Sequence, residues 1–317
     1  MRAPPHRPGA ARLRAALAAG LLALLVALVA AAATPSPAAA TFRHDDDRRH
    51  VQAVLDSLAR HPGTSPIVYL LGGSSARESI TSEPSWRAQI AASGGGRVRA
   101  YNFGSSSETY AADISVVERA PDVPTLVLIG VNVGRYTSQY PTAAAPAAAV
   151  GRAAAAKTAG RAVYDSHRFH AGQQLSDAAK HAMVSQWLRE RYPLFKARFA
   201  HHAAELRLLV EACQARGFRA VIVELPVNLP IVRHAWDAPR HQYQSDCRVV
   251  AATYRIRYND FVGGIALTSS DFMDLSHLVE PGRVKYQRRL SRLVATRLHQ
   301  YNIESSVPRK ERAPDNG

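Results

Sequence analysis

The 317-residue chain has little of what metal and redox chemistry requires. Its two cysteines, Cys213 and Cys247, form neither a Cys-x-x-Cys pair nor a Cys/His cluster of the kind that binds zinc. Two histidine-containing stretches, residues 167–170 and 201–202, lack further ligands at metal spacing. We therefore expect neither a metal nor an organic cofactor.

Acidic residues are also scarce. Asp and Glu number 25 against 40 Lys and Arg, which gives a net charge of +15. Such an excess favours acidic partners, among them an acidic polymer of the cell envelope. Compositional drift in an Arg- and Ala-rich chain is the other explanation, because the sequence has no long basic block and no basic stripe interleaved with aromatic residues.

The N-terminus carries an export signal. Four arginines precede an uncharged apolar run from Ala15 to Ala33, and a small-residue A-x-A site follows at residues 38–40. The run nearly reaches the roughly 20 residues that span a bilayer, so it is either a cleaved signal peptide or a retained membrane anchor. In both cases we expect the body of the protein outside the cytoplasmic membrane, with a cleaved chain beginning near Thr41. Nucleic acid is then not an expected partner.

Apolar strand-like runs alternate with helical patterns. The expected strands are residues 67–71, 98–103, 125–130, 220–225 and 264–267. The first three are separated by segments long enough for crossover helices, which predicts a parallel sheet with helices on both faces. A helix before residue 217 should end at Gly217, and a C-terminal helix should begin near Pro281. The expected fold class is α/β, with three α/β/α layers and a mainly parallel five-stranded sheet.

The chain divides into three parts around this fold. Residues 41–304 form the expected domain, between the export segment at 1–40 and a polar tail at 305–317 that is expected to be disordered. Within the domain, residues 133–177 contain no clear strand and include an Ala-rich stretch, which predicts an insertion after the third strand. The insertion is either a lid over a site or a surface loop.

The first three strands each end in residues suited to a site. They run into Gly72-Gly73-Ser74-Ser75, into Asn102-Phe103-Gly104-Ser105 and into Gly130-Val131-Asn132. In an open parallel sheet, ligands bind outside the carboxyl ends of the strands, so we expect these residues to meet in one crevice. Asp274 and His277 follow just before the last helix.

Serine, histidine and aspartate together allow acyl-enzyme chemistry. Serine is a poor nucleophile unless a base accepts its proton, and the base needs a group that fixes its tautomer. We expect Ser74 as the nucleophile, His277 as the base and Asp274 as the orienting carboxylate. The amides of Ser74 and Gly104 and the side chain of Asn132 are the candidate donors to the oxyanion.

This pattern resembles the SGNH (GDSL-like) hydrolases, which are named for Ser, Gly, Asn and His in four sequence blocks. The family's order is met by Ser74, Gly104, Asn132 and the pair Asp274 and His277. The resemblance covers about residues 67–298 and implies a flavodoxin-like SGNH fold with an acyl-enzyme on Ser74. Gly73 stands where the family's Gly-Asp-Ser has aspartate, and Val133 stands where aspartate often follows the asparagine. In these departures the chain resembles the divergent exported branch of the family, whose members act on acyl groups of envelope polysaccharides.

We therefore predict an exported serine esterase that removes O-acyl groups, acetyl in the first place, from an envelope carbohydrate or a small ester. An O-acyltransferase with the same triad and a non-catalytic envelope-binding module are the alternatives. An α/β-hydrolase is disfavoured because Ser74 lacks a G-x-S-x-G elbow. A P-loop is disfavoured because no G-x-x-x-x-G-K-[ST] motif follows Gly72.

Several residues keep a second interpretation. Ser75 is the nucleophile if the alignment slips by one residue. Asn132 and Asp274 could each simply cap a turn. Arg77 and Glu78 could form a local ion pair or contact the substrate.

The two cysteines fall on helices that flank the strand at residues 220–225. Helices joined through right-handed crossovers can pack side by side on one face of a sheet. The sequence therefore leaves two possibilities: a disulfide between Cys213 and Cys247, or two separate buried thiols.

Overall fold

The structure, a computed structural model, describes residues 44–106, 108–137 and 167–306. The export segment, most of the predicted insertion (residues 138–166) and residues 307–317 lie outside the described residues. None of the helices in the described part of the chain is both long and apolar enough to cross a membrane.

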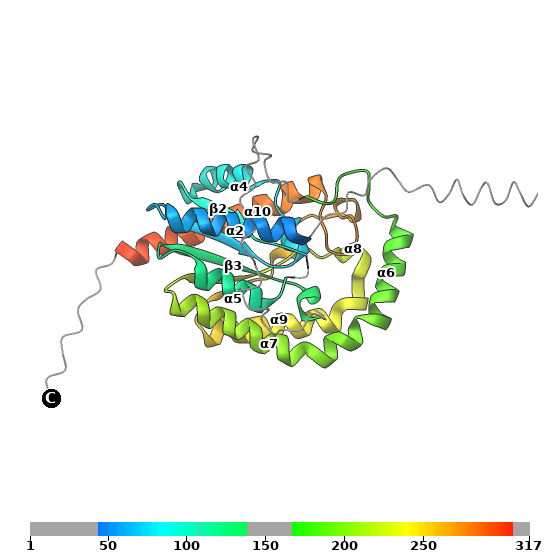
Figure 1. Ribbon diagram of the computed structural model, residues 1–317. Helices are drawn as coiled ribbons and strands as arrows, with labels where there is room; N and C mark the ends of the chain where they lie inside the picture. The colour runs from blue at the N-terminus through cyan, green and yellow to red at the C-terminus, as the bar shows by residue number, and fades with distance from the viewer. Residues whose placement is uncertain (1–43, 107, 138–166, 307–317) are drawn as a thin grey trace, which may run out of the picture. The chain divides into compact units, whose positions relative to one another are not determined.

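Five parallel strands form one sheet in the order β2-β1-β3-β4-β5. They are β1 (Ile67–Leu71), β2 (Arg99–Asn102), β3 (Thr125–Val131), β4 (Arg219–Glu224) and β5 (Arg257–Asn259). Every residue of the central strands β1 and β3 is buried, as expected where helices cover both faces of a sheet. The α/β class with a parallel five-stranded sheet is confirmed (Figure 1).

The fifth strand is not where the sequence predicted it. β5 is a three-residue edge strand, Arg257–Asn259, whose residues are exposed or only partly buried. An edge strand pairs with only one neighbouring strand and is only partly buried, so its sequence need not be a run of apolar residues. The predicted run at 264–267 begins at the last residue of the short 3₁₀ helix Phe261–Gly264, and its side chains Ile265 and Leu267 pack against the core outside the sheet.

Helices cover the two faces of the sheet (Figure 1). On one face α4 (Glu83–Ile90) packs against α10 (Glu280–Ser306), and on the other α7 (Tyr192–Ala215) packs against α5 (Tyr110–Arg119) and α9 (Asp237–Thr253). This is the arrangement that right-handed crossovers produce. The other α-helices in the described part of the chain are α2 (His44–Arg60), α3 (Ser74–Arg77), α6 (Asp177–Glu190) and α8 (Leu229–Val232).

The helix ends largely follow the sequence signals. Gly217, with φ 68°, follows the end of α7 as predicted. Pro281 lies in the first turn of α10, also as predicted. That helix continues to Ser306, so the first two residues of the tail predicted to be disordered are helical.

Both cysteines are buried free thiols. Cys213 on α7 and Cys247 on α9 belong to helices that contact each other, as expected, but no disulfide joins them. The sulfur of Cys247 lies 3.8 Å from the hydroxyl of Tyr136 instead. Burial raises the pKa of each thiol to about 12, so neither is a reactive thiolate at neutral pH.

Candidate active site

A sharp turn joins β1 to α3 and places Ser74 at the carboxyl end of the sheet. Gly72 has φ 151°, and a Cβ atom there would lie 3.0 Å from the Cβ of Ala76, so the position favours glycine. Gly73 is extended, and α3 begins at Ser74. The two glycines therefore let a fully buried strand end in an accessible serine.

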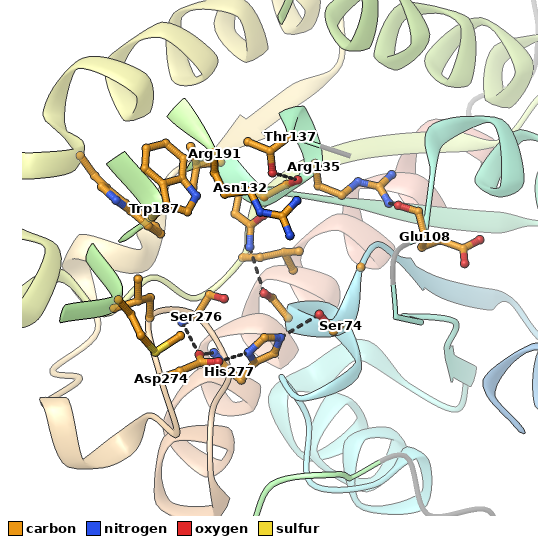
Figure 2. A pocket seen from close by; sticks show the side chains of 18 residues that line it. Ser74, Glu108, Asn132, Arg135, Thr137, Trp187, Arg191, Asp274, Ser276 and His277 are labelled. Carbon is orange, nitrogen blue, oxygen red and sulfur yellow. Dashed lines mark hydrogen bonds and ion pairs between the residues drawn. The ribbon is translucent and has the colours of Figure 1, made fainter. Parts of the chain in front are cut away.

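Ser74 belongs to a continuous hydrogen-bonded chain with His277 and Asp274 (Figure 2). The distance from Ser74 Oγ to His277 Nε2 is 2.7 Å, and that from His277 Nδ1 to Asp274 Oδ2 is also 2.7 Å. Asp274 Oδ1 accepts hydrogen bonds from the backbone N–H groups of Ser276 and His277, at 2.9 and 3.0 Å. Asp274 thus both caps its turn and holds the imidazole, so its two interpretations are compatible.

Neighbouring segments support the loop that carries Asp274 and His277. The Met273 N–H donates to the His277 carbonyl at 2.8 Å, and Asn228 Nδ2 donates to the Asp274 carbonyl at 2.9 Å. The ring of Phe169 packs against the imidazole with a centroid distance of 5.0 Å. The base is therefore fixed by backbone, side-chain and aromatic contacts together.

The electrostatics keep Asp274 ionised. Burial raises its pKa, but His277 and the amide N–H groups of Ser276 and His277 outweigh burial and hold the pKa below its ordinary value. A carboxylate accepts the Nδ1–H of the imidazole and so leaves Nε2 free to accept the proton of Ser74. This is the arrangement that a serine nucleophile, an imidazole base and an orienting carboxylate require.

Ser75 is positioned differently from its neighbour. It is buried, and its Oγ accepts a hydrogen bond from Asn132 Nδ2 at 3.0 Å rather than meeting His277. Asn132 Oδ1 accepts from the Gly134 N–H at 3.0 Å and so caps the 3₁₀ helix Val133–Tyr136. The orientation of the Asn132 amide is thereby set, with its NH₂ group directed to the serine turn.

Gly104 is not placed as the sequence predicted. Its N–H already donates to Asn102 Oδ1 at 3.0 Å, and Gly104 does not line the pocket at Ser74. A Cβ atom on Gly104 would lie 2.2 Å from the backbone nitrogen of Arg77, so this glycine permits close packing of its loop on α3. In this structure the side chain of Asn102 accepts the hydrogen bond of the Gly104 N–H, so the role of this amide as an oxyanion donor stays a prediction.

Two donors remain for an oxyanion. No described group accepts a hydrogen bond from the Ser74 N–H at the start of α3. Asn132 Nδ2 carries a second hydrogen besides the one bound to Ser75. Both residues line the pocket. In sites of this kind the loss of one such donor costs roughly 3–4 kcal/mol of transition-state stabilisation.

The triad opens into a pocket of about 720 Å³. Part of its wall comes from α6 and the residue after it, through Met183, Trp187 and Arg191, with Trp236 beside them. These residues were missed in the sequence, because they belong to no motif. Their spacing of four residues, which places all three on one helical face, was the signal that could have found them.

Behind the nucleophile turn lies a charged cluster formed by Asp47, Arg77, Glu78, Arg168 and Arg283. Arg77 binds Glu78 at 3.1 Å and Asp47 at 3.0 Å, and Arg283 binds Glu78 at 2.5 Å. Arg168 reaches Asp47 at 3.1 Å. Glu78 and Arg283 are 0% exposed, so Arg77 and Glu78 form an ion pair within the protein rather than contact a substrate.

The described end of the predicted insertion passes close to the triad. His167 Nε2 lies 2.7 Å from the Ile80 carbonyl, and the Phe169 carbonyl accepts a hydrogen bond from Arg283. The Ala171 N–H donates to Glu280 at 2.6 Å. Hydrogen bonds therefore join this segment to the turn after α3 and to the start of α10. The prediction that the insertion is a lid or a surface loop concerns residues 138–166, which lie outside the described residues.

Glu108 also lines the pocket, before α5. Burial first, and the nearby Asp113 second, raise its pKa to about 7. Ser105 Oγ donates to the carboxylate, and Arg135 donates to the Glu108 backbone carbonyl at 2.9 Å. Thr109, the residue after Glu108, caps α5 with its side chain.

One group of side chains has the composition of a metal site. His201, His202 and Glu205 on α7 bring their ligand atoms within 4.8 Å of one another. The expectation that the two histidines lack a further neighbouring ligand is thus wrong for Glu205. His202 Nδ1 lies 2.7 Å from the Glu205 carboxylate, so a hydrogen bond joins these two groups without an ion, whereas His202 Nε2 is buried and has no hydrogen-bond partner among the described residues.

Comparisons with known proteins bear on the fold. No family model and no curated protein matches the sequence. The structure is similar to a variant of an acetylxylan esterase from Geobacillus stearothermophilus, at 13% identity and TM-score 0.44, over 73% of this chain and 95% of that one. It is also similar to a GDSL-like lipase from Bacteroides thetaiotaomicron, at 10% identity and TM-score 0.43, over 80% and 98%. An esterase of the SGNH-hydrolase family is 13% identical, with TM-score 0.39, over 78% and 98%.

At these identities and TM-scores the likeness concerns only the general layout of the chain. It carries no information about the substrate. The chemistry of this chain follows from its own residues, above all from the hydrogen bonds that join Ser74, His277 and Asp274.

Proposed function

We propose that this chain is an exported SGNH-type serine esterase that removes O-acyl groups, in the first place acetyl, from a carbohydrate ester of the cell envelope. The observation that carries the proposal is the chain of two 2.7 Å hydrogen bonds from Asp274 through His277 to Ser74, at the wall of a pocket. The export part of the proposal rests on the basic N-terminus and the apolar run that follows it.

Acylation begins when Ser74 Oγ attacks the ester carbonyl. His277 Nε2 accepts the hydroxyl proton, and Asp274 stabilises the imidazolium that results. The Ser74 N–H and Asn132 Nδ2 donate to the oxyanion of the tetrahedral intermediate. The C–O bond to the alcohol then breaks, and His277 returns its proton to the leaving oxygen.

Deacylation uses the same groups with water in place of the alcohol. His277 accepts a proton from the water that attacks the acyl-enzyme, and Ser74 leaves with a proton from His277. The carboxylic acid is released and the triad returns to its starting state. No step calls for a group beyond the residues named.

Acyl transfer to a sugar hydroxyl is the alternative that keeps the same catalytic residues, because only the acceptor in the second step changes. Added glycan acceptors that accelerate turnover and emerge acylated would favour transfer. A non-catalytic binding module is less well supported, since it gives no reason for the hydrogen-bonded alignment of all three triad residues.

A fluorophosphonate probe tests the assignment, because it labels only an activated serine. We expect the wild-type protein to be labelled at Ser74 and Ser74→Ala to lose both labelling and release of acetate from an acetyl ester. Ser75→Ala is the matched control, since the Ser75 hydroxyl bonds to Asn132 rather than to His277, and the variant should still be labelled at Ser74. Labelling of a properly folded Ser74→Ala variant would overturn the proposal.

A further inference from the structure

The esterase mechanism leaves one part of the pocket wall without a role. Met183, Trp187 and Arg191 follow one another at intervals of four residues, and all three line the pocket. The Arg191 N–H donates to the Trp187 carbonyl at 2.8 Å, so the helical path continues to the arginine. In Figure 2, Trp187 and Arg191 lie across the pocket from Ser74 and His277.

Trp187 provides an aromatic surface that is held in place from behind. The centroid of its ring lies 4.8 Å from the ring centroid of Trp236, a residue that is 3% exposed. The centroid of the Tyr192 ring lies 5.9 Å away. The Trp236 Nε1–H is buried and has no acceptor among the described residues. A rigid indole at a pocket wall suits a flat ligand face with C–H groups, such as one side of a sugar ring.

Arg191 differs from the other arginine of this pocket. Arg135 is buried and binds the carboxylate of Asp113. The guanidinium of Arg191 is exposed, and no carboxylate or carbonyl among the described residues binds it. A guanidinium so placed can form two parallel hydrogen bonds to a carboxylate that enters the pocket.

We infer that this wall is a subsite for an acidic sugar. Trp187 packs on the face of the sugar ring, and Arg191 binds its carboxylate while the acyl group lies at Ser74. The inference rests on the proposed function and names its substrate class, an O-acylated glycan that carries a uronate carboxylate near the ester. The net charge of +15 favours the approach of such a polymer.

The experiment compares two substrates that differ only in charge. One is an O-acetylated oligouronate, and the other is the same oligosaccharide with its carboxylates converted to primary amides. Acetate release gives kcat/KM for each. We expect the wild-type enzyme to prefer the acidic substrate, and Arg191→Gln to lower the ratio of the two values by about tenfold.

Arg189→Gln is the matched control, because Arg189 is an exposed arginine of the same helix that does not line the pocket. It should leave the ratio at the wild-type value. An unchanged ratio in Arg191→Gln, an equal fall in Arg189→Gln, or no preference in the wild type would each overturn the acidic subsite. Acetate release by Ser74→Ala would instead overturn the proposed function, so the two failures are distinguishable.

Discussion

The two sides of the nucleophile turn use arginine in opposite ways. Behind the turn, Arg77 and Arg283 are buried and bind carboxylates. Across the pocket, Arg191 is exposed and has no partner among the described residues. A buried cation must be paired because its desolvation costs several kcal/mol, whereas an exposed cation can remain unpaired until a ligand binds. The first side therefore holds the site in shape, and the second is suited to recognition.

The largest effect is expected on the catalytic side, from Asp274→Asn. The amide no longer enforces the tautomer in which Nδ1 carries the proton, so kcat on an acetyl ester should fall by about 10⁴-fold while the fold is kept. Steady-state kinetics and circular dichroism measure the two quantities. Asp46→Asn, at a half-exposed surface aspartate, is the control. A loss of less than tenfold in Asp274→Asn would contradict the role of Asp274.

The next effect tests the supporting side. Glu78→Gln leaves Arg77 and Arg283 buried without their shared carboxylate, and we expect the free energy of unfolding to fall by roughly 3–5 kcal/mol. Urea denaturation measures it. Asp46→Asn breaks the exposed pair with Arg49, and that loss should stay below about 1 kcal/mol. Equal losses in both variants would remove the distinction between the two sides.

A smaller effect concerns Glu108, a carboxyl group that lines the pocket. Its pKa in the folded protein is about 7, above the ordinary 4.5, so the folded state binds the proton more tightly than the unfolded state. The free energy of unfolding should therefore decrease, by about 3 kcal/mol from this group, as the pH rises from about 4.5 to about 7.

Glu108→Gln should lack this decrease, so the variant should gain stability over the wild type at pH 8 but not at pH 4. Urea denaturation across that range gives the comparison, and Glu118→Gln, at an exposed position on α5, should follow the wild-type curve. A wild-type stability that rises over the same interval relative to Glu108→Gln would show that the shift has the opposite sign.

The parts of the molecule that could be predicted from sequence are those with local signals. The strands β1 and β3 are continuous apolar runs because both their faces are covered. Ser74 follows a glycine turn, and Asp274 lies three residues from His277, so their roles depend on short-range spacing. The parallel order of the strands then brings these residues to one edge.

The parts that could not be predicted depend on long-range or competing contacts. Glu78 and Arg283 are 205 residues apart in the chain, and no local sequence pattern predicts that they form an ion pair. The hydrogen bond from the Gly104 N–H to Asn102 Oδ1 was not foreseen, because the sequence does not show which acceptor a loop amide meets. The edge strand β5 was missed because it is only partly buried, and a partly buried strand can form without a run of apolar residues.

The separation of the nucleophile from its base has a consequence for biosynthesis. Ser74 and His277 lie 203 residues apart, so the serine emerges from the ribosome long before its base has been synthesised. Until the last quarter of the chain has docked, Ser74 is an ordinary alcohol that cannot attack esters. Under the proposed mechanism, catalytic activity is therefore acquired late in folding, and a chain truncated before His277 should have no esterase activity.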